Sequence, residues 1–184
     1  GSFSDQSELL SEDVDASIGS IWLDYDNNGY LDLMAVGPTF STRIYANSKD
    51  GFAVIEERES FQLTTDTLIN TLSTSDSDND GDLDLFFAFG GVNRLFENAA
   101  DANLGNWLKV KPVGTISSKL PYGTKVSLFV DINGENQIIS RWLMSQNGHN
   151  SQNDHYLHFG LGNAASIDSI KIYYSSGLEN TLYD

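Results

Sequence analysis

The sequence predicts an all-β protein with two propeller-blade-like, four-stranded repeats that carry calcium loops, followed by a small C-terminal β-sandwich. Short alternating runs of apolar and polar residues are punctuated by Gly, Asn, Asp and Ser, and no segment keeps a helical period. One acidic segment recurs after 52 residues, and a repeat of about 50 residues is typical of propeller blades. All of the excess negative charge lies in residues 1–104.

The composition of the 184-residue chain excludes several classes of protein. A net charge of −16 argues against nucleic acid as a partner and against docking on anionic membranes, because both need a basic surface. The sequence contains no run of about 18 apolar residues, so no transmembrane segment is expected. The absence of cysteine excludes disulfides, zinc–thiolate sites and a cysteine nucleophile.

The charge divides the chain into two parts. Residues 1–104 hold 20 acidic and 4 basic side chains, whereas residues 105–184 hold 6 of each. We expect a tag scar and leader over 1–13, the two repeats over 14–104 and a second domain over 105–184. The small polar stretch that ends near Asn106 is the expected junction, and the whole chain is expected to be a fragment of a larger protein.

The repeats are defined by two acidic segments of the form D-x-D-x-[DN]-G-x-x-D, over residues 24–32 and 76–84. We call them loop one and loop two. An apolar run follows each loop, from Leu31 and from Leu83, and predicts a strand. The first repeat has strands expected at 17–23, 31–36, 44–45 and 52–55, and residues 56–70 are expected to connect the two repeats.

The spacing within each loop suits a calcium cage. Side chains at positions 1, 3, 5 and 9 and the carbonyl at position 7 can converge on one ion, with glycine at position 6 taking the sharp turn. An all-oxygen cage with five or more ligands favours Ca²⁺ over zinc, copper or magnesium. The expected ligands of the two Ca²⁺ sites are Asp24, Asp26, Asn28, the Tyr30 carbonyl and Asp32, and Asp76, Asp78, Asp80, the Asp82 carbonyl and Asp84.

Two alternatives exist for these loops. EF-hands are excluded, because Ala35 and Phe87 stand where an EF-hand has glutamate, and because strands rather than helices follow. Acidic turns without metal are disfavoured, since four or five clustered carboxylates repel one another. Asn28 leaves loop one with fewer carboxylates than loop two, which predicts weaker calcium binding there.

The second part of the chain also reads as strands. They are expected at 107–111, 125–131, 136–144, 156–159 and 167–174, with a hairpin turn at 132–135. The three tryptophans, Trp22, Trp107 and Trp142, have a ring that can stack on sugars, but their positions inside strands favour packing in the core. His149, His155 and His158 lie near Asp154, and a structural role for His158 is favoured over a zinc or catalytic cluster.

These residues resemble two known families. The stretch from Ile21 to Leu33 is similar to an FG-GAP/VCBS repeat, the blade of integrin-α-type propellers, and a second copy covers about 71–98. The second part resembles the ASPIC/UnbV domain of cartilage acidic protein-like bacterial proteins, through Asn106-Trp107-Leu108 and His158-Phe159-Gly160-Leu161-Gly162 among others. Two departures, at 118–119 and 174–177, fall on residues without a known chemical role.

The resemblance implies a secreted or cell-surface, calcium-binding module that mediates adhesion through a protein or carbohydrate ligand of the cell surface or matrix. No motif for a catalytic site is found, so an enzyme is disfavoured. Two alternatives stay open. One is a calcium-dependent enzyme with its site at a propeller face or between the domains, and the other is a structural cap of a repeat array.

Overall fold

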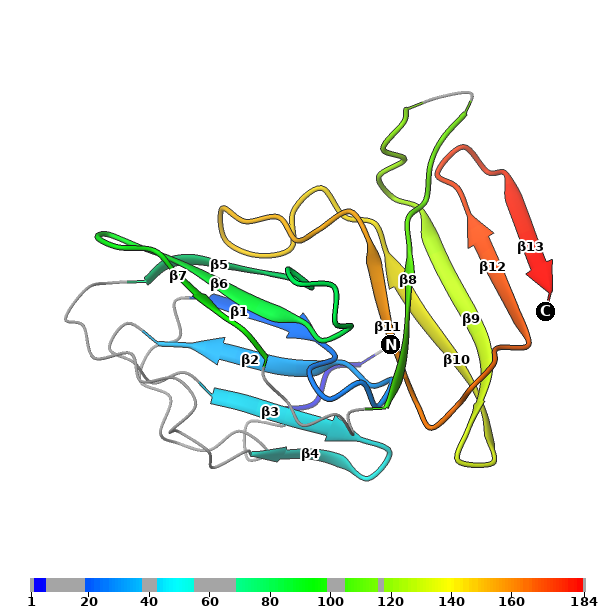
Figure 1. Cartoon of the computed structure of the whole chain (residues 1–184), viewed down its shortest axis with the longest axis horizontal. Coiled ribbons are helices and arrows are strands. Elements are labelled where there is room, and N and C mark those ends of the chain that lie inside the picture. The colour runs from blue at the N-terminus through cyan, green and yellow to red at the C-terminus, as the bar shows by residue number, and fades with distance from the viewer. Residues whose placement is uncertain are drawn as a thin grey trace.

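The structure, a computed structural model, describes residues 2–5, 19–37, 43–54, 69–98, 105–115 and 118–183. All regular secondary structure in these ranges is β-strand, which confirms the all-β prediction (Figure 1). Within them there is no helix long and apolar enough to cross a membrane. Most of the expected leader and junction lies outside the described residues, as do residues 56–68 of the connection expected over 56–70. The last two residues of that connection belong to a strand instead.

The first repeat forms one antiparallel sheet in the order β1-β2-β3-β4. Its strands are β1 (Gly19–Leu23), β2 (Asp32–Val36), β3 (Arg43–Ser48) and β4 (Gly51–Val54). The register pairs Leu23 with Asp32, so loop one closes the hairpin between β1 and β2. Ile21 and Leu23 are buried while Trp22 between them is exposed, as the two-residue period of a strand requires.

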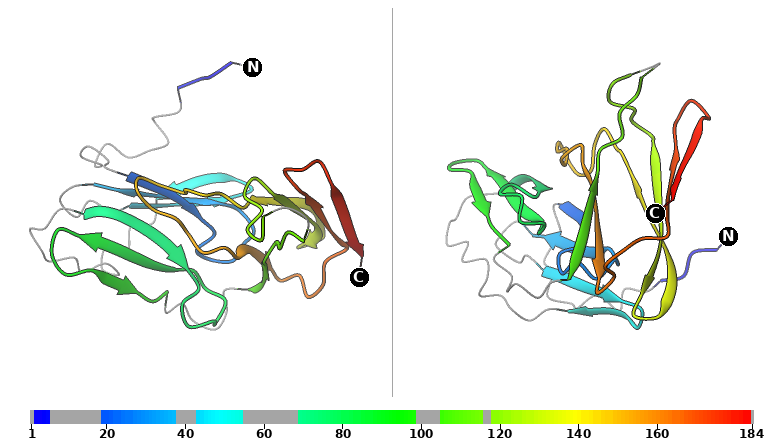
Figure 2. Two further views of the ribbon diagram at one scale, coloured as in Figure 1. Left: turned by 90° about the horizontal axis from the view of Figure 1, so that it is seen from above. Right: turned by 45° about the vertical axis from the view of Figure 1, so that its right-hand side comes forward.

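In the described residues the second repeat forms an antiparallel sheet of three strands rather than the predicted four, namely β5 (Ile69–Ser75), β6 (Asp84–Phe89) and β7 (Arg94–Phe96). Loop two closes the hairpin between β5 and β6, where Ser75 pairs with Asp84. The two sheets lie as neighbouring layers (Figure 2) and share one hydrophobic core. That core includes Ile21 and Met34 from the first sheet and Leu72 and Phe87 from the second.

The second domain is a small sandwich with its own core. Its four-stranded sheet has the order β10-β9-β12-β13, and β11 pairs with β8 beside it. The strands are β8 (Asn106–Val110), β9 (Lys125–Ile132), β10 (Glu135–Trp142), β11 (Leu157–Gly162), β12 (Ser169–Tyr173) and β13 (Glu179–Tyr183). Asn133 and Gly134 make the tight β9–β10 turn, both with positive φ. Leu128 and Phe159 are buried between the two sheets.

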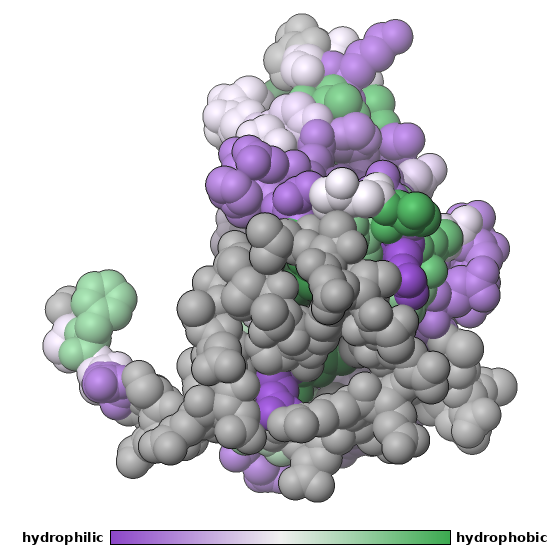
Figure 3. Space-filling model, turned by 90° about the vertical axis from the view of Figure 1, so that its left-hand side faces the viewer, coloured by the Kyte–Doolittle hydropathy of each residue, from purple (hydrophilic) through white to green (hydrophobic). Residues whose placement is uncertain are grey.

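The exposure of the aromatic residues differs from expectation. Trp22, Trp107 and Trp142 are 52%, 38% and 50% exposed, so the prediction that they pack in the core is wrong. Of the neighbouring phenylalanines, Phe87 is fully buried between the two blade sheets whereas Phe86, on the opposite face of β6, is 40% exposed. On one side of the molecule apolar residues therefore reach the surface among hydrophilic ones (Figure 3).

The second domain contacts the repeat region through β8, β10 and β11. In Figure 1 the β8–β11 pair lies between the blade sheets and the four-stranded sheet. Hydrogen bonds join β10 and β11 to loop one, and β8 and β11 to loop two. This arrangement places the two acidic loops at the boundary of the two domains.

Candidate functional site

Loop one is held in shape by its own polar side chains. Asp24 Oδ2 accepts a hydrogen bond from the Gly29 N–H at 3.1 Å, and Asp26 Oδ1 accepts one from Asn28 N–H at 3.2 Å. Asn28 Oδ1 accepts one from the Tyr30 N–H at 2.8 Å. Each contact links an odd-numbered position of the loop to a backbone group two or five residues later, which winds the loop around one centre.

Loop two repeats this pattern. Asp76 Oδ2 accepts from the Gly81 N–H at 3.2 Å, Asp78 Oδ1 from the Asp80 N–H at 3.2 Å, and Asp80 Oδ1 from the Asp82 N–H at 2.9 Å. The two loops therefore share one internal hydrogen-bond arrangement, although their sequences differ at several positions. The internal repeat predicted from the sequence extends to this level of detail.

Carboxylates converge at the centre of each loop. In loop one, oxygens of Asp24, Asp26 and Asp32 all lie within 4.8 Å of one another. In loop two, oxygens of Asp76, Asp78 and Asp80 do the same. The structure thus brings together three of the predicted ligands in each loop, and it leaves Asp84 outside the second group.

The aspartates at position 9 also hold the backbone of each repeat together. Asp32 accepts the N–H groups of Tyr25 and Asn47, at 3.0 and 2.6 Å. Asp84 accepts the N–H groups of Ser77 and Asn98 in the same way, at 2.8 and 2.9 Å. These carboxylates tie each loop to the end of the third strand of its sheet.

Burial disfavours the ionised form of the carboxyl groups in loop one. Desolvation raises the pKa of Asp24 to about 7, even though Arg141 opposes the shift, and raises the pKa of Asp32 to about 6. Desolvation also raises the pKa of Asp26. Three carboxyl groups with raised pKa values therefore lie around one point.

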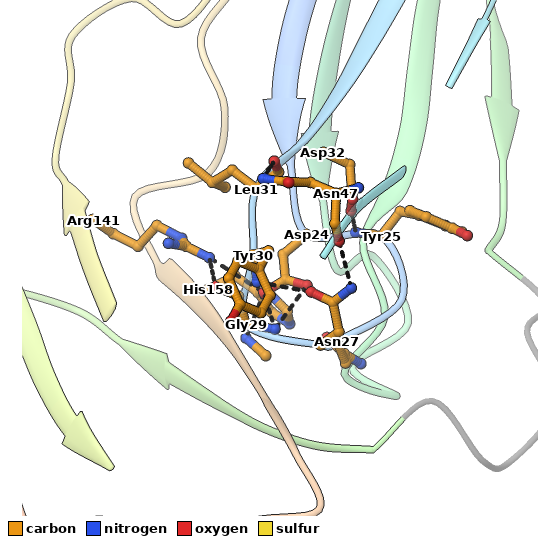
Figure 4. Close-up of polar contacts among 12 residues, drawn as sticks. Asp24, Tyr25, Asn27, Gly29, Tyr30, Leu31, Asp32, Asn47, Arg141 and His158 are labelled. Atoms are coloured by element: carbon orange, nitrogen blue, oxygen red, sulfur yellow. Dashed lines mark hydrogen bonds and ion pairs between the residues drawn. The ribbon is translucent and has the colours of Figure 1, made fainter. Parts of the chain in front are cut away.

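The second domain supplies one cation to the first aspartate of each loop. Arg141 Nη2, from β10, lies 3.2 Å from Asp24 Oδ2 and also donates to the Gly29 carbonyl at 3.3 Å (Figure 4). Lys109 Nζ, from β8, lies 3.0 Å from Asp76 Oδ2. Both aspartate side chains are only 1% exposed, so these are buried ion pairs.

The backbone of β11 also contacts loop one directly. The Gly160 N–H donates to Asp24 Oδ2 at 3.1 Å, and the Gly162 N–H donates to the Asn27 carbonyl at 2.8 Å. A Cβ atom on Gly160 would lie 2.4 Å from the carbonyl carbon of Asn27, so only glycine fits here. Asn27 itself has a φ of 57°, a left-handed conformation that asparagine tolerates better than most residues.

Loop two is covered by His158 and Trp107. His158 Nε2 bonds the Gly81 carbonyl at 2.8 Å and therefore carries the proton, since a carbonyl only accepts. Desolvation lowers the pKa of His158 to about 4, which keeps the ring neutral. Trp107 lies so close to Gly81 that a Cβ there would be 1.7 Å from its Nε1.

The two loops also contact each other. Asn27 Nδ2 donates to the Gly81 carbonyl at 3.3 Å and to Asp82 Oδ1 at 2.8 Å. In addition, Asn98, which follows β7 in the second repeat, donates from Nδ2 to the Tyr25 carbonyl of loop one at 2.9 Å. Both loops and the adjoining strands of the second domain therefore form one connected polar centre.

One atom of loop two lacks a partner. Asp76 Oδ1 is buried and forms no hydrogen bond with any described residue. A buried carboxylate oxygen without a partner is energetically costly, and proteins normally supply a donor or a metal ion to such an atom. The donor set around it, which consists of carboxylate oxygens, suits a hard divalent cation.

The histidines do not form a common site. His155 Nε2 contacts the Tyr122 hydroxyl at 3.0 Å, His149 Nε2 contacts Asn150 at 3.0 Å, and His158 bonds loop two. Among the described residues none of the three joins a metal-ligand group. The structural role expected for His158 agrees with its hydrogen bond to loop two.

A cleft of about 520 Å³ opens beside the two loops, between the domains. Asp24, Asp76, Lys109, Arg141 and His158 all line it. Its remaining walls come from β1, β5, β10 and the segment before β11. The polar centre is thus reached from a hollow on the surface.

Sequence reasoning missed the residues that connect the domains. Arg141, Lys109 and Gly160 lie outside both loops, and Asn27 occupies a position of loop one that the motif does not specify. Arg141 lies 117 positions from its partner Asp24. The charge distribution was the one available indication of these contacts. The second domain carries as many basic as acidic residues, whereas the repeat region is strongly acidic. Charge balance alone does not name the pairs.

Comparison with known families agrees with this architecture. The family model described as an FG-GAP-like repeat matches residues 24–87, which span loop one and loop two. The model described as ASPIC and UnbV matches residues 114–184, which cover most of the second domain. No curated protein matches the chain significantly.

Proposed function

We propose that this chain, which carries an FG-GAP-like repeat followed by an ASPIC and UnbV domain, binds two calcium ions in loop one and loop two. The observation that carries the proposal is the convergence of three carboxylates in each loop within 4.8 Å of one another. The ions would stabilise a β module that binds a macromolecular ligand outside the cell.

The charge around loop one supports a divalent ion. Among the residues that the structure describes, Asp24, Asp26 and Asp32 share one ion-pair partner, Arg141, so three carboxylates face one positive charge. In loop two the carboxylates of Asp76, Asp78 and Asp80 have Lys109 as their one ion-pair partner within the described part of the chain. One Ca²⁺ in each loop would neutralise this excess and give Asp76 Oδ1 the partner that it lacks.

The type of ligand favours calcium over other metals. Carboxylate, amide and carbonyl oxygens are the ligands of a hard cation, whereas zinc and copper prefer nitrogen and sulfur. Magnesium keeps several waters and is seldom bound by protein oxygens alone. Asn28 and the Tyr30 and Asp82 carbonyls are the further ligands proposed for these cages.

Calcium would act on stability and on the contact between the domains. At a free concentration about 100 times Kd, each bound ion adds about 2.7 kcal/mol to the free energy of unfolding. Extracellular calcium modules have Kd values of about 10⁻⁴–10⁻³ M, so such sites fill where calcium is abundant. This is the reason to propose a secreted or cell-surface location and a role in adhesion, with a protein or carbohydrate as ligand.

Calorimetric titration of chelator-treated protein with CaCl₂ tests the proposal. We expect two sites, one lost in Asp24→Asn and the other in Asp76→Asn. Asp168→Asn, which removes an exposed acid of the second domain, is the matched control and should keep both sites. The absence of calcium binding, or equal binding in all three variants, would contradict the proposal.

A calcium-dependent enzyme is the second candidate, and one observation favours it. Asp24 lines the cleft, and its pKa is raised to about 7, a value suited to a general acid or base. However, Asp24 already accepts hydrogen bonds from Arg141, Gly29 and Gly160, so a binding module is the better supported proposal.

A further inference from the structure

The cleft between the domains has an aromatic mouth. Trp22 from β1, Trp142 at the end of β10 and Tyr156 before β11 all line it, and they are 52%, 50% and 40% exposed. The three rings come from separate segments of the chain. Large aromatic surfaces left in water around a concave site are typical of ligand-binding sites.

Neighbouring side chains hold these exposed rings in position. Trp22 packs against Phe52, with ring centroids 6.1 Å apart. Lys125 Nζ lies 5.3 Å from the centre of the Trp142 ring. A ring that is already fixed loses little conformational entropy when a ligand stacks on it.

Two lysines hold the third ring. Lys109 Nζ and Lys111 Nζ lie 5.3 and 4.7 Å from the centre of the Tyr156 ring. Because lysines already lie over Tyr156 and Trp142, a cationic ligand is disfavoured at this mouth.

The lining of the cleft is more apolar than polar, with Leu83, Leu143 and Met144 among the apolar residues, but it also includes charged side chains. The ion pairs Arg141–Asp24 and Lys109–Asp76 lie there, so a purely apolar ligand would have to bury charged groups without compensation. Thr74, Ser75 and Ser140 also line it, and the Ser140 hydroxyl is paired with that of Ser127 at 2.9 Å.

Two amides on the wall are oriented as donors. Asn153 Oδ1 accepts from the Thr74 N–H at 3.1 Å, and Asn147 Oδ1 accepts from the Asn153 N–H at 3.2 Å. These contacts fix the amide oxygens, and neither Nδ2 group donates to another described residue. The two Nδ2 groups are therefore available to a ligand's acceptors.

We propose that this cleft binds a saccharide. A pyranose ring has an apolar C–H face that can stack on an aromatic ring and hydroxyls that both donate and accept hydrogen bonds, so it matches aromatic rings beside carboxylates, amides and hydroxyls. A volume of about 520 Å³ falls in the range for small-molecule sites and accommodates a few sugar units. The inference names the ligand class that the proposed function leaves open.

Calorimetric titration with defined oligosaccharides tests the inference. The probes are the β-1,4-linked hexaoses of glucose, N-acetylglucosamine and mannose and an α-1,4-linked hexagalacturonate, added to wild-type protein in calcium buffer. We expect at least one of them to bind, with affinity reduced about tenfold in Trp22→Ala and in Trp142→Ala, because each change removes a stacking surface. Tyr183→Ala, which removes an aromatic ring 79% exposed on β13, is the matched control and should bind as the wild type does.

The inference is overturned if none of the four probes binds, or if binding is the same in all three variants. Equal melting temperatures of the variants would show that the fold is intact, as expected for exposed rings. Calcium titration of the same samples separates the two proposals. Calcium binding without saccharide binding would overturn only this inference, and saccharide binding without calcium binding would overturn only the calcium sites.

Discussion

Gly160 leaves no room for a side chain where β11 meets loop one. A Cβ atom would lie 2.4 Å from the Asn27 carbonyl carbon and 2.6 Å from Asp24 Oδ2. Gly160→Ala should therefore push β11 away from loop one and lower the free energy of unfolding by about 1–3 kcal/mol in a denaturant titration. Gly19→Ala is the control, because its Cβ would meet nothing nearer than 3.8 Å, and an equal loss in both variants would contradict the account.

Protons should compete with calcium in loop one. The pKa of Asp24 is raised to about 7 and that of Asp32 to about 6, so both carboxyls take up protons as the pH falls through this window. Since calcium binds the ionised form, its affinity should drop about 100-fold between pH 7.5 and 5.5. The Asp76→Asn variant, which keeps only loop one, is suited to the measurement by calorimetry, and a constant affinity over this range would refute the prediction.

At the scale of elements, the two faces of β6 lie in different environments, one buried and one exposed. Phe87 is fully buried and packs edge-on against Phe96, with centroids 5.5 Å apart, whereas its neighbour Phe86 is 40% exposed. Phe87→Ala should cost about 3–5 kcal/mol of unfolding free energy, because it opens a cavity between the two blade sheets. Phe86→Ala should cost less than about 1 kcal/mol. Chemical denaturation of both variants measures the difference, and similar losses would place the shared core elsewhere.

The sequence was informative about elements for a physical reason. Loop spacing, strand alternation and the repeat are local patterns, and local patterns determine hairpins such as β1–β2 and β5–β6. The tryptophans were misjudged because alternation says that Trp22 faces away from Ile21 and Leu23 but does not say which face is buried. The residues that complete the polar centre could not be predicted, since Arg141 and Asp24 lie 117 positions apart in different domains and no local pattern connects them.

At the scale of the whole molecule, buried ion pairs connect the two domains. Arg141→Gln leaves Asp24 without its cation and should destabilise the calcium-free protein by about 3–5 kcal/mol. Calcium in loop one would supply the missing charge, so the loss should be smaller in the calcium-loaded protein. Thermal melting with calcium and with chelator measures both values.

The surface pair Lys49–Glu135 provides the control for that comparison. It also joins the two domains, at 3.2 Å, but its side chains are 62% and 56% exposed. Lys49→Gln should therefore leave the melting temperature nearly unchanged in either condition, because the exposed pair is screened by solvent. If Arg141→Gln behaves like Lys49→Gln, or loses as much stability with calcium as without it, the link between the loops and the domain boundary is wrong.

Hydrogen exchange of the intact chain, compared with and without calcium, tests the central claim most directly. The account predicts that calcium slows exchange strongly in residues 24–32 and 76–84 and in the β1–β2 and β5–β6 hairpins. It predicts a smaller effect in β11, which contacts loop one, and little change in β9 and β12, whose core lies within the second domain. An equal change in both domains, or no change in the two loops, would contradict it.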